Sequence, residues 1–273
     1  MFETLSAVRI TMVTGVDTRL GLATARRLAA DGAAVILHAQ GKEGAEEAFE
    51  ELAQAGTPAA RLHVVHANFL KLTEVDELAA TLGATVTRLD ALIDAASIPG
   101  GERRSRTEDG YETTLQANYL APQRLITALA PAVAAAQGRV VTVSSPQHVG
   151  GTVDYSDLDR NRGIYTPLAV YAQSKLAMTM FTRTLAETGP EGLTAVSVHP
   201  ADFEIDMPQL RSQVNAPMDD AADLLAMYSG SGAPVVNGCY YEGTQLARPA
   251  ALVRNSRARA RLAAWTNQQH PTA

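Results

Sequence analysis

Hydrophobic residues follow two spacings that alternate along most of the chain. Continuous apolar runs are typical of strands buried on both faces, whereas apolar residues that recur every three or four positions are typical of amphipathic helices. The runs predict strands at residues 8–14, 33–39, 61–67, 89–97, 138–145 and 192–200. The helical spacing predicts helices at residues 20–32, 42–56, 73–86, 111–136 and 168–187. Because strands and helices take turns, the pattern predicts an α/β fold with a doubly wound parallel sheet and helices on both faces.

The end of the chain has a less regular pattern. It predicts a helix at 218–229, a short strand at 238–243 and a basic helix at 254–265. Four arginines make the last helix basic, which indicates a solvated face or a subunit contact more often than a phosphate or membrane site. They are Arg254, Arg257, Arg259 and Arg261. No repeat, low-complexity tract or flexible linker divides the sequence, so we expect a single domain over residues 1–273.

Composition narrows the classes of partner. The 273 residues are 46% hydrophobic and 19% charged, with a net charge of −6, which is the balance of a globular protein. An acidic chain has no overall positive field for nucleic acid or an anionic bilayer. No apolar stretch approaches the roughly 18 residues of a membrane helix, and the first residues lack a secretion signal. We therefore expect a cytoplasmic protein with no nucleic-acid partner and no membrane partner.

Metal chemistry is also disfavoured. The only cysteine, Cys239, cannot form a disulfide within the chain or a thiolate cluster. His63 and His66 are three apart on a predicted strand, which places them on opposite faces, and nothing completes a ligand set. We expect no metal site.

The turn after the first strand carries the first functional signal. It reads TGVDTRLGL, with Gly15 and Gly21 on either side of the step into a helix. In a dinucleotide fold, such glycines let backbone N–H groups approach a pyrophosphate at a helix N-terminus. The alternative is a tight turn without a ligand. Arg19 stands where a third glycine would reduce bulk, so its side chain either clashes with a ligand or supplies a positive charge.

Four features in order make the chain resemble the short-chain dehydrogenase/reductase family. Thr14, Gly15 and Gly21 match its TGxxxGxG motif, apart from Arg19. The other three are the pair Tyr171 and Lys175 in YAQSK, the serines of TVSS, and Asn118 in LQANYL. Within the family the sequence is most similar to the branch of retinol dehydrogenases and protochlorophyllide reductases. The resemblance covers nearly the whole chain and implies a Rossmann-type fold.

This resemblance implies a role for each matching residue. Tyr171 is the general acid/base, and Lys175 also holds the ribose hydroxyls next to the nicotinamide. Ser145, the second serine of its motif, hydrogen-bonds the substrate oxygen, and Asn118 anchors a water relay to the lysine. Residues four apart share one helix face, so an ammonium at Lys175 is expected to favour the ionised Tyr171 phenol. The alternative is an ordinary half-buried tyrosine beside a solvated lysine.

The cofactor-binding pattern is altered where the catalytic pattern is kept. The family's NNAG reads Asp94, Ala95, Ala96 and Ser97, and its PGxxxT reads Pro200, Ala201 and Ile205. Asn68 takes the place of an aspartate that often follows the third strand. The residues expected at the cofactor are Gly15, Arg19, Leu20, Gly21, Asn68, Asp94, Ala95, Tyr171, Lys175 and Pro200.

Three functions remain open. The chain is a reductase of a carbonyl, or oxidises the alcohol, with a modified grip on its cofactor. Alternatively it binds a dinucleotide weakly or not at all and uses the same residues for a cyclisation, dehydration, aldol or isomerisation step. A binding or regulatory protein without catalysis is the third.

NADP(H) is favoured over NAD(H) by elimination. Ala39 and Gln40 leave no carboxylate at the end of the second strand for a ribose 2′-hydroxyl. Arg19, His38 and Lys42 are the candidate partners of a 2′-phosphate, although a strand-end histidine and a solvated lysine explain the last two equally well.

The substrate is expected to be a small to medium organic molecule. Its walls would come from the loops at residues 99–110, 146–167 and 201–218. Gln147, His148, Tyr155 and Tyr165 are candidate contacts, with a local structural role as the alternative for each. By resemblance, the helices that hold Asn118 and Tyr171 would assemble a homodimer or homotetramer.

Overall fold

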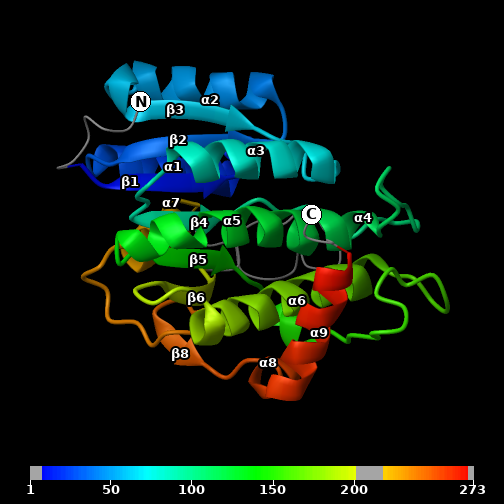
Figure 1. Cartoon of the computed structure of the whole chain (residues 1–273). Coiled ribbons are helices and arrows are strands. Elements are labelled where there is room, and N and C mark those ends of the chain that lie inside the picture. The colour runs from blue at the N-terminus through cyan, green and yellow to red at the C-terminus, as the bar shows by residue number, and fades with distance from the viewer. Residues whose placement is uncertain (1–7, 201–217, 270–273) are drawn as a thin grey trace.

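One sheet of eight strands runs through the molecule. The computed structural model describes residues 8–200 and 218–269. The strands are β1 (Ile10–Thr14), β2 (Ala34–Ala39), β3 (Leu62–His66), β4 (Ala91–Asp94), β5 (Arg139–Val143), β6 (Thr194–His199), β7 (Tyr240–Glu242) and β8 (Gln245–Ala247). Their order is β3-β2-β1-β4-β5-β6-β7-β8, and all neighbours are parallel except β7 and β8 (Figure 1). This confirms the predicted α/β fold with a doubly wound parallel sheet.

Helices cover both faces of the sheet. They are α1 (Arg19–Ala30), α2 (Lys42–Gln54), α3 (Leu72–Thr85), α4 (Thr113–Leu115), α5 (Ala121–Ala135), α6 (Pro167–Thr188), α7 (Met218–Ser229), α8 (Ala251–Arg254) and α9 (Ser256–Gln268). The apolar sides of α1, α2 and α7 form one core with the sheet, and those of α3, α5 and α6 form the other. Successive strand residues point into opposite cores: Met12 belongs to the core with α3, α5 and α6, and Val13 belongs to the core with α1, α2 and α7. This is why the strands read as continuous apolar runs.

The structure differs from the predicted elements in four ways. The observed strands are shorter at one or both ends than the predicted ones because the flanking residues belong to turns. The helix predicted over 111–136 is divided by a π-helical turn at Gln116–Leu120. The basic helix predicted over 254–265 is two helices, α8 and α9, which meet at Asn255, whose side chain caps α9. The short antiparallel strand β8 has no counterpart in the prediction.

Within residues 8–200 and 218–269, no helix combines the length and the apolar character that a membrane span requires.

The order of the strands creates a crevice. From β1 the chain moves outward to β2 and β3, then crosses back to β4 on the other side of β1. The loops that leave β1 and β4 therefore separate at the carboxyl ends of these strands, which is where open α/β sheets bind ligands.

Candidate active site

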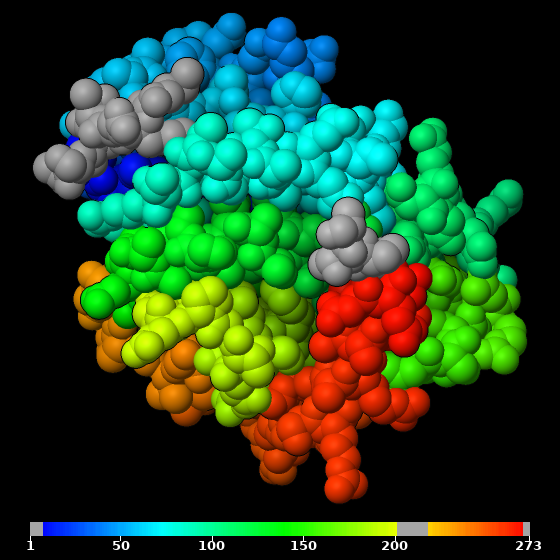
Figure 2. Space-filling view, viewed as in Figure 1, coloured from blue at the N-terminus to red at the C-terminus, as the bar shows by residue number. Residues whose placement is uncertain are grey.

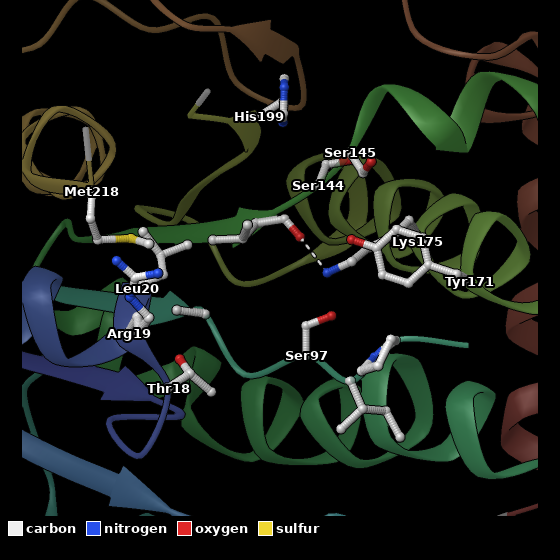
Figure 3. A pocket seen from close by; sticks show the side chains of 14 residues that line it. Thr18, Arg19, Leu20, Ser97, Ser144, Ser145, Tyr171, Lys175, His199 and Met218 are labelled. Atoms are coloured by element: carbon white, nitrogen blue, oxygen red, sulfur yellow. Dashed lines mark hydrogen bonds between the residues drawn. The ribbon is translucent and has the colours of Figure 1, made fainter. Parts of the chain in front are cut away.

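A pocket of about 220 Å³ opens at this crevice (Figure 3). It is lined by the start of α1, the segments that follow β4 and β5, and two side chains of α6. The lining residues are Thr18, Arg19, Leu20, Ala95, Ser97, Ile98, Pro99, Val143, Ser144, Ser145, Tyr171, Lys175, His199 and Met218. Three of the four predicted catalytic residues are among them, and Asn118 is not.

Both predicted glycines are required by packing at the start of the pocket. Gly15 has a φ of +72°, and a Cβ there would lie 2.7 Å from the Cα of Ala96. A Cβ on Gly21 would lie 2.0 Å from the carbonyl oxygen of Gly15. Thr18 Oγ1 donates to that same oxygen at 2.7 Å and accepts the Gly21 N–H at 3.1 Å, which caps α1. The turn thus brings the N-terminus of α1 to the pocket, where the helix dipole favours an anion.

Arg19 is the first residue of α1, and its side chain lines the pocket beside Leu20. Figure 3 shows the guanidinium on the same side of the pocket as Thr18. The position is compatible with both predicted effects of this arginine, contact with an anion and obstruction of the pocket.

Tyr171 and Lys175 lie one turn apart on α6 and share its buried face, with 4% and 3% of their surfaces exposed. Lys175 Nζ donates to the carbonyl oxygen of Val143 at 3.0 Å and lies 5.6 Å from the centre of the Tyr171 ring. The hydroxyls of Ser145 and Ser97 lie close enough to the Tyr171 phenol to lower its pKa. The i, i+4 spacing and the end of β5 therefore place a hydroxyl, a phenol and an ammonium in one pocket.

Burial dominates the acidity of Tyr171. It raises the pKa of the phenol to about 12, and the Ser145 and Ser97 hydroxyls oppose this rise only in part. Burial thus outweighs the groups that favour the phenolate, and the predicted effect of the Lys175 ammonium on the Tyr171 phenol stays a prediction. At pH 7 the phenol keeps its proton and is a donor.

The two serines after β5 have different surroundings. Ser144 Oγ pairs with Thr179 Oγ1 at 2.8 Å, inside the sheet–helix interface. Ser145 Oγ accepts the Gln147 N–H at 3.3 Å and faces the phenol. The geometry favours Ser145 for contact with a substrate oxygen.

Asp94 lies behind the pocket rather than on its wall. Its Oδ1 accepts the Thr14 hydroxyl at 2.9 Å, and Thr14 Oγ1 in turn accepts the N–H groups of Ala95 and Ala96 at 3.1 Å each. Burial raises the pKa of Asp94 to about 6, which the positive charge of Lys175 opposes. Burial likewise lowers the pKa of Lys175 to about 8, which the charge of Asp94 opposes. The two groups thus form a buried pair of opposite charges.

Asn118 supports the pocket from outside. It lies in the π-helical turn, and its amide accepts the Ile98 N–H at 2.8 Å and donates to the Ile98 carbonyl at 2.9 Å. The same amide nitrogen is 3.1 Å from Ser174 Oγ. These bonds hold the segment after β4, including Ser97, against α6.

Several other predicted contacts have structural roles. Buried His38 accepts the Gly15 N–H and donates to the Ala67 carbonyl, and burial lowers its pKa to about 4. It is therefore neutral at pH 7 and is removed from the candidates for a phosphate. Asn68 closes a local turn by accepting the Leu70 N–H. Pro200 follows β6 and is buried, while Ala201 and Ile205 lie outside the described residues.

Three of the four candidate substrate contacts also have structural roles. His148 is fully buried and donates through Nδ1 to the Ser145 carbonyl at 2.7 Å. Tyr155 donates to the Ala258 carbonyl and Tyr165 to Glu112. For these three residues, the local structural alternative accounts for the position. Gln147 is half-buried beside Ser145, and most of the loop 201–218 lies outside the described residues.

The pocket also has lining residues at the ends of β6 and α7. His199, the last residue of β6, lines the pocket without having been predicted, and Met218, the first residue of α7, lines it as the last residue of the loop 201–218 that was expected to form a wall. A polar residue at the carboxyl end of a central strand is the one signal that could have indicated His199.

The lining fits a polar, elongated ligand. Ser97 Oγ is buried and lies near the Tyr171 phenol. Figure 3 shows it directed toward Tyr171 and Lys175. Lys175 has three N–H donors, of which the bond to Val143 uses one. A ligand with hydroxyl groups here and a phosphate near the start of α1 would satisfy both sets, so the residues present fit a nicotinamide dinucleotide.

Similarity to known proteins is a second and independent source of evidence. A model of the short chain dehydrogenase family matches residues 9–215. Polyprenol dehydrogenase of Mus musculus is 37% identical over 183 residues, 65% of this chain and 53% of that protein. Retinol dehydrogenase 13 of Homo sapiens is 32% identical over 191 residues, 69% of this chain and 57% of that protein. The chain thus spans little more than half the length of these relatives. The structure of an uncharacterized protein from Mycobacterium Paratuberculosis is 27% identical, with a TM-score of 0.78 over 97% of this chain and 94% of that one.

Proposed function

Since this chain belongs to the short-chain dehydrogenase family, we propose that it is an oxidoreductase that reversibly reduces a carbonyl of a small to medium organic molecule with NADP(H). The observation that carries the proposal is the group of Ser145, Tyr171 and Lys175 in one pocket at the carboxyl ends of β4 and β5. A buried phenol that keeps its proton at pH 7 suits the reducing direction.

Each residue has a defined task in this proposal. Ser145 Oγ hydrogen-bonds the substrate carbonyl oxygen and orients it toward Tyr171. The Tyr171 phenol donates its proton to that oxygen as negative charge develops there. Lys175 holds ribose hydroxyls with its remaining N–H groups and stabilises the phenolate that is left. The bound dinucleotide supplies the hydride. Asn118 keeps the segment of Ser97 in position.

Arg19 is the residue on which the NADP preference depends. His38 is neutral, and Lys42 pairs with Glu46 at 3.5 Å. Asp17 places a carboxylate against the Gln40 N–H at the end of β2, at 3.0 Å, which disfavours a nearby phosphate. If Arg19 holds the 2′-phosphate, Arg19→Gly weakens NADPH binding more than NADH binding. Tighter binding of both would show that Arg19 obstructs the pocket and would overturn its proposed role.

The first experiment is a calorimetric titration of the protein with NADPH, NADP, NADH and NAD. Micromolar binding with a preference for the phosphorylated pair supports the proposal and leads to a screen of ketones and aldehydes that follows NADPH consumption. Tyr171→Phe should abolish turnover of any substrate found. Tyr155→Phe is the matched control, because that hydroxyl bonds the Ala258 carbonyl and does not line the pocket. Full activity of Tyr171→Phe would overturn the mechanism.

One observation favours a second candidate. The side chains of Arg19 and Ser97 both line the pocket at positions where the family pattern has glycine. If no dinucleotide binds to the folded protein, the same three residues support acid–base chemistry without a redox step, such as an isomerisation or a dehydration.

The proposed partner is a small-molecule substrate, and a cytoplasmic location and self-association stay predictions. Helix α9 packs across α6, and Tyr119 in the π-helical turn hydrogen-bonds Thr266 of α9 at 2.6 Å (Figure 1). Part of the helix surface predicted to join subunits is therefore covered within the chain.

A further inference from the structure

A second cavity, of about 460 Å³, lies near the edge of the sheet formed by β7 and β8. Its walls come from α6, β7, the end of β8 and the segment after it, and helices α8 and α9. Figure 1 and Figure 2 show α8 at the lower end of the molecule, with α9 rising from it beside α6. The lining residues are Arg183, Glu187, Gly238, Cys239, Tyr240, Ala247, Pro249, Val253, Arg254, Ser256 and Arg259. None of them belongs to the pocket at Tyr171, so the two sites are separate.

Positive charge exceeds negative charge in this lining. Glu187 is the one carboxylate, and it is shared: Arg183 Nε donates to its Oε1 at 2.6 Å, and Arg259 pairs with its Oε2. Arg259 is 6% exposed and also donates to the Val253 carbonyl at 2.6 Å. The guanidinium of Arg254 makes no hydrogen bond or ion pair with the described residues. The lining therefore carries two positive charges more than Glu187 balances.

The last 30 residues of the chain supply no acidic side chain to balance these arginines. From Thr244 to the end of the chain there is no aspartate or glutamate, and there are five arginines, in a protein with a net charge of −6. Two of these arginines have structural partners: Arg259 pairs with Glu187, and Arg261 stacks on the Tyr155 ring at 4.2 Å. Arg254 is exposed and also lines the cavity.

Apolar groups form the rest of the lining. Tyr240, Ala247, Pro249 and Val253 give the cavity a hydrocarbon surface next to the guanidinium groups. Its volume lies within the roughly 300 to 1,000 Å³ of small-molecule sites, which are mostly apolar with a few polar groups that orient the ligand. Guanidinium groups match the planar, two-oxygen geometry of a carboxylate.

We propose that this cavity binds a small organic carboxylate, with its charged group at Arg254 and Arg183 and its hydrocarbon part against Tyr240 and Val253. One residue, His148, connects Tyr240 in the cavity wall to the backbone of Ser145. The Tyr240 and His148 rings meet edge to face with centres 4.5 Å apart, and His148 bonds the Ser145 carbonyl on one side and the Ala250 N–H on the other. A ligand in this cavity would thus contact Tyr240, which packs against His148 and through it supports the loop of Ser145.

Cys239 provides a direct test. It is half-buried in the cavity lining and is the only cysteine of the chain, so its alkylation by iodoacetamide, a neutral reagent, reports on this cavity alone. The alkylation rate is measured against increasing benzoate, and against benzyl alcohol as the uncharged counterpart. The proteins are the wild type, Arg254→Gln and Arg257→Gln. Arg257 is exposed on α9 and does not line the cavity, so its variant matches the change in net charge.

We expect benzoate to slow alkylation of the wild type and of Arg257→Gln in a saturable way with the same midpoint. Arg254→Gln should need at least tenfold more benzoate, and benzyl alcohol should protect at least tenfold less well. Titration of benzoate by calorimetry into the three proteins gives the same comparison without the thiol reaction. The proposal is overturned if benzoate neither protects nor binds up to tens of millimolar, if both arginine variants lose binding equally, or if benzyl alcohol protects as well as benzoate. None of these results depends on the proposed reductase activity.

Discussion

Replacing Asp94 by asparagine removes a buried negative charge close to Lys175, and the Lys175 ammonium should then lose its proton at a lower pH. Both side chains are 3% exposed and lie on the same side of the sheet, Asp94 at the end of β4 and Lys175 on α6. The family pattern has a neutral asparagine at position 94. The pair of opposite charges is therefore a property of this chain.

The size of the effect follows from the balance of burial and charge. Burial lowers the pKa of Lys175 to about 8, and Asp94 opposes that fall. With this pKa about nine tenths of Lys175 is protonated at pH 7. Opposite charges a few ångströms apart interact by roughly 1 to 4 kcal/mol, depending on their exposure to water. Since about 1.4 kcal/mol corresponds to one pH unit, this range lowers the Lys175 midpoint in Asp94→Asn by roughly 0.7 to 3 units.

The lysine content of the chain makes this measurable without a substrate. There are three lysines, Lys42, Lys71 and Lys175. Labelling with lysine that carries ¹³C at Cε gives one NMR signal for each, and the exposed Lys42 and Lys71 serve as internal references in a pH titration. Asp90→Asn is the matched control, because Asp90 precedes β4 at its opposite end and bonds the Ile10 N–H there.

We expect Lys175 to titrate near pH 8 in the wild type and in Asp90→Asn, and at a lower pH in Asp94→Asn. An unchanged Lys175 midpoint in Asp94→Asn would refute the argument that Asp94 keeps this lysine charged. A wild-type midpoint equal to those of the two exposed lysines would refute the argument that burial lowers it.

Two further predictions concern the turn after β1, and both are read by urea denaturation. Gly21→Ala should destabilise the fold by about 1 to 3 kcal/mol, because the new Cβ would lie 2.0 Å from the Gly15 carbonyl. Gly83→Ala, in the last turn of α3 with its nearest contact at 3.9 Å, should instead stabilise by up to about 1 kcal/mol, and equal effects would contradict the packing argument. His38 has its pKa lowered from 6.5 to about 4 by burial, so the unfolded chain binds more protons between these values, and stability falls as the pH falls through this window. That loss is about 2 kcal/mol between pH 7 and pH 5, and it should be absent in His38→Gln. A His38→Gln variant that loses as much stability as the wild type would show that another group is responsible.

The sequence was a good guide wherever neighbours along the chain decide the structure. Continuous apolar runs predicted β1 to β6, because a strand between two helix layers has to be apolar on both faces. The spacing of four residues was enough to put Tyr171 and Lys175 on one face of α6. Ser145 entered the prediction through the resemblance to the family, as the second serine of TVSS.

Contacts between distant segments decided the rest. The carboxyl group of Asp94 lies behind the pocket because Thr14, 80 residues earlier, binds it there. The pKa of Tyr171 rises because the fold removes the phenol from water, an effect that outweighs the opposing influence of the Ser145 and Ser97 hydroxyls. His38 turns inward to bond Gly15 and Ala67 instead of reaching a phosphate.

The C-terminal arginines show the same division. Their number and the absence of nearby acids were evident from the chain alone. Which of them pairs with Glu187, which stacks on Tyr155 and which faces a cavity depends on how α8 and α9 pack against α6. Local sequence determines the periodicity and the charge of an element, whereas burial, ion pairing and the shape of a site depend on residues that only the tertiary structure brings together.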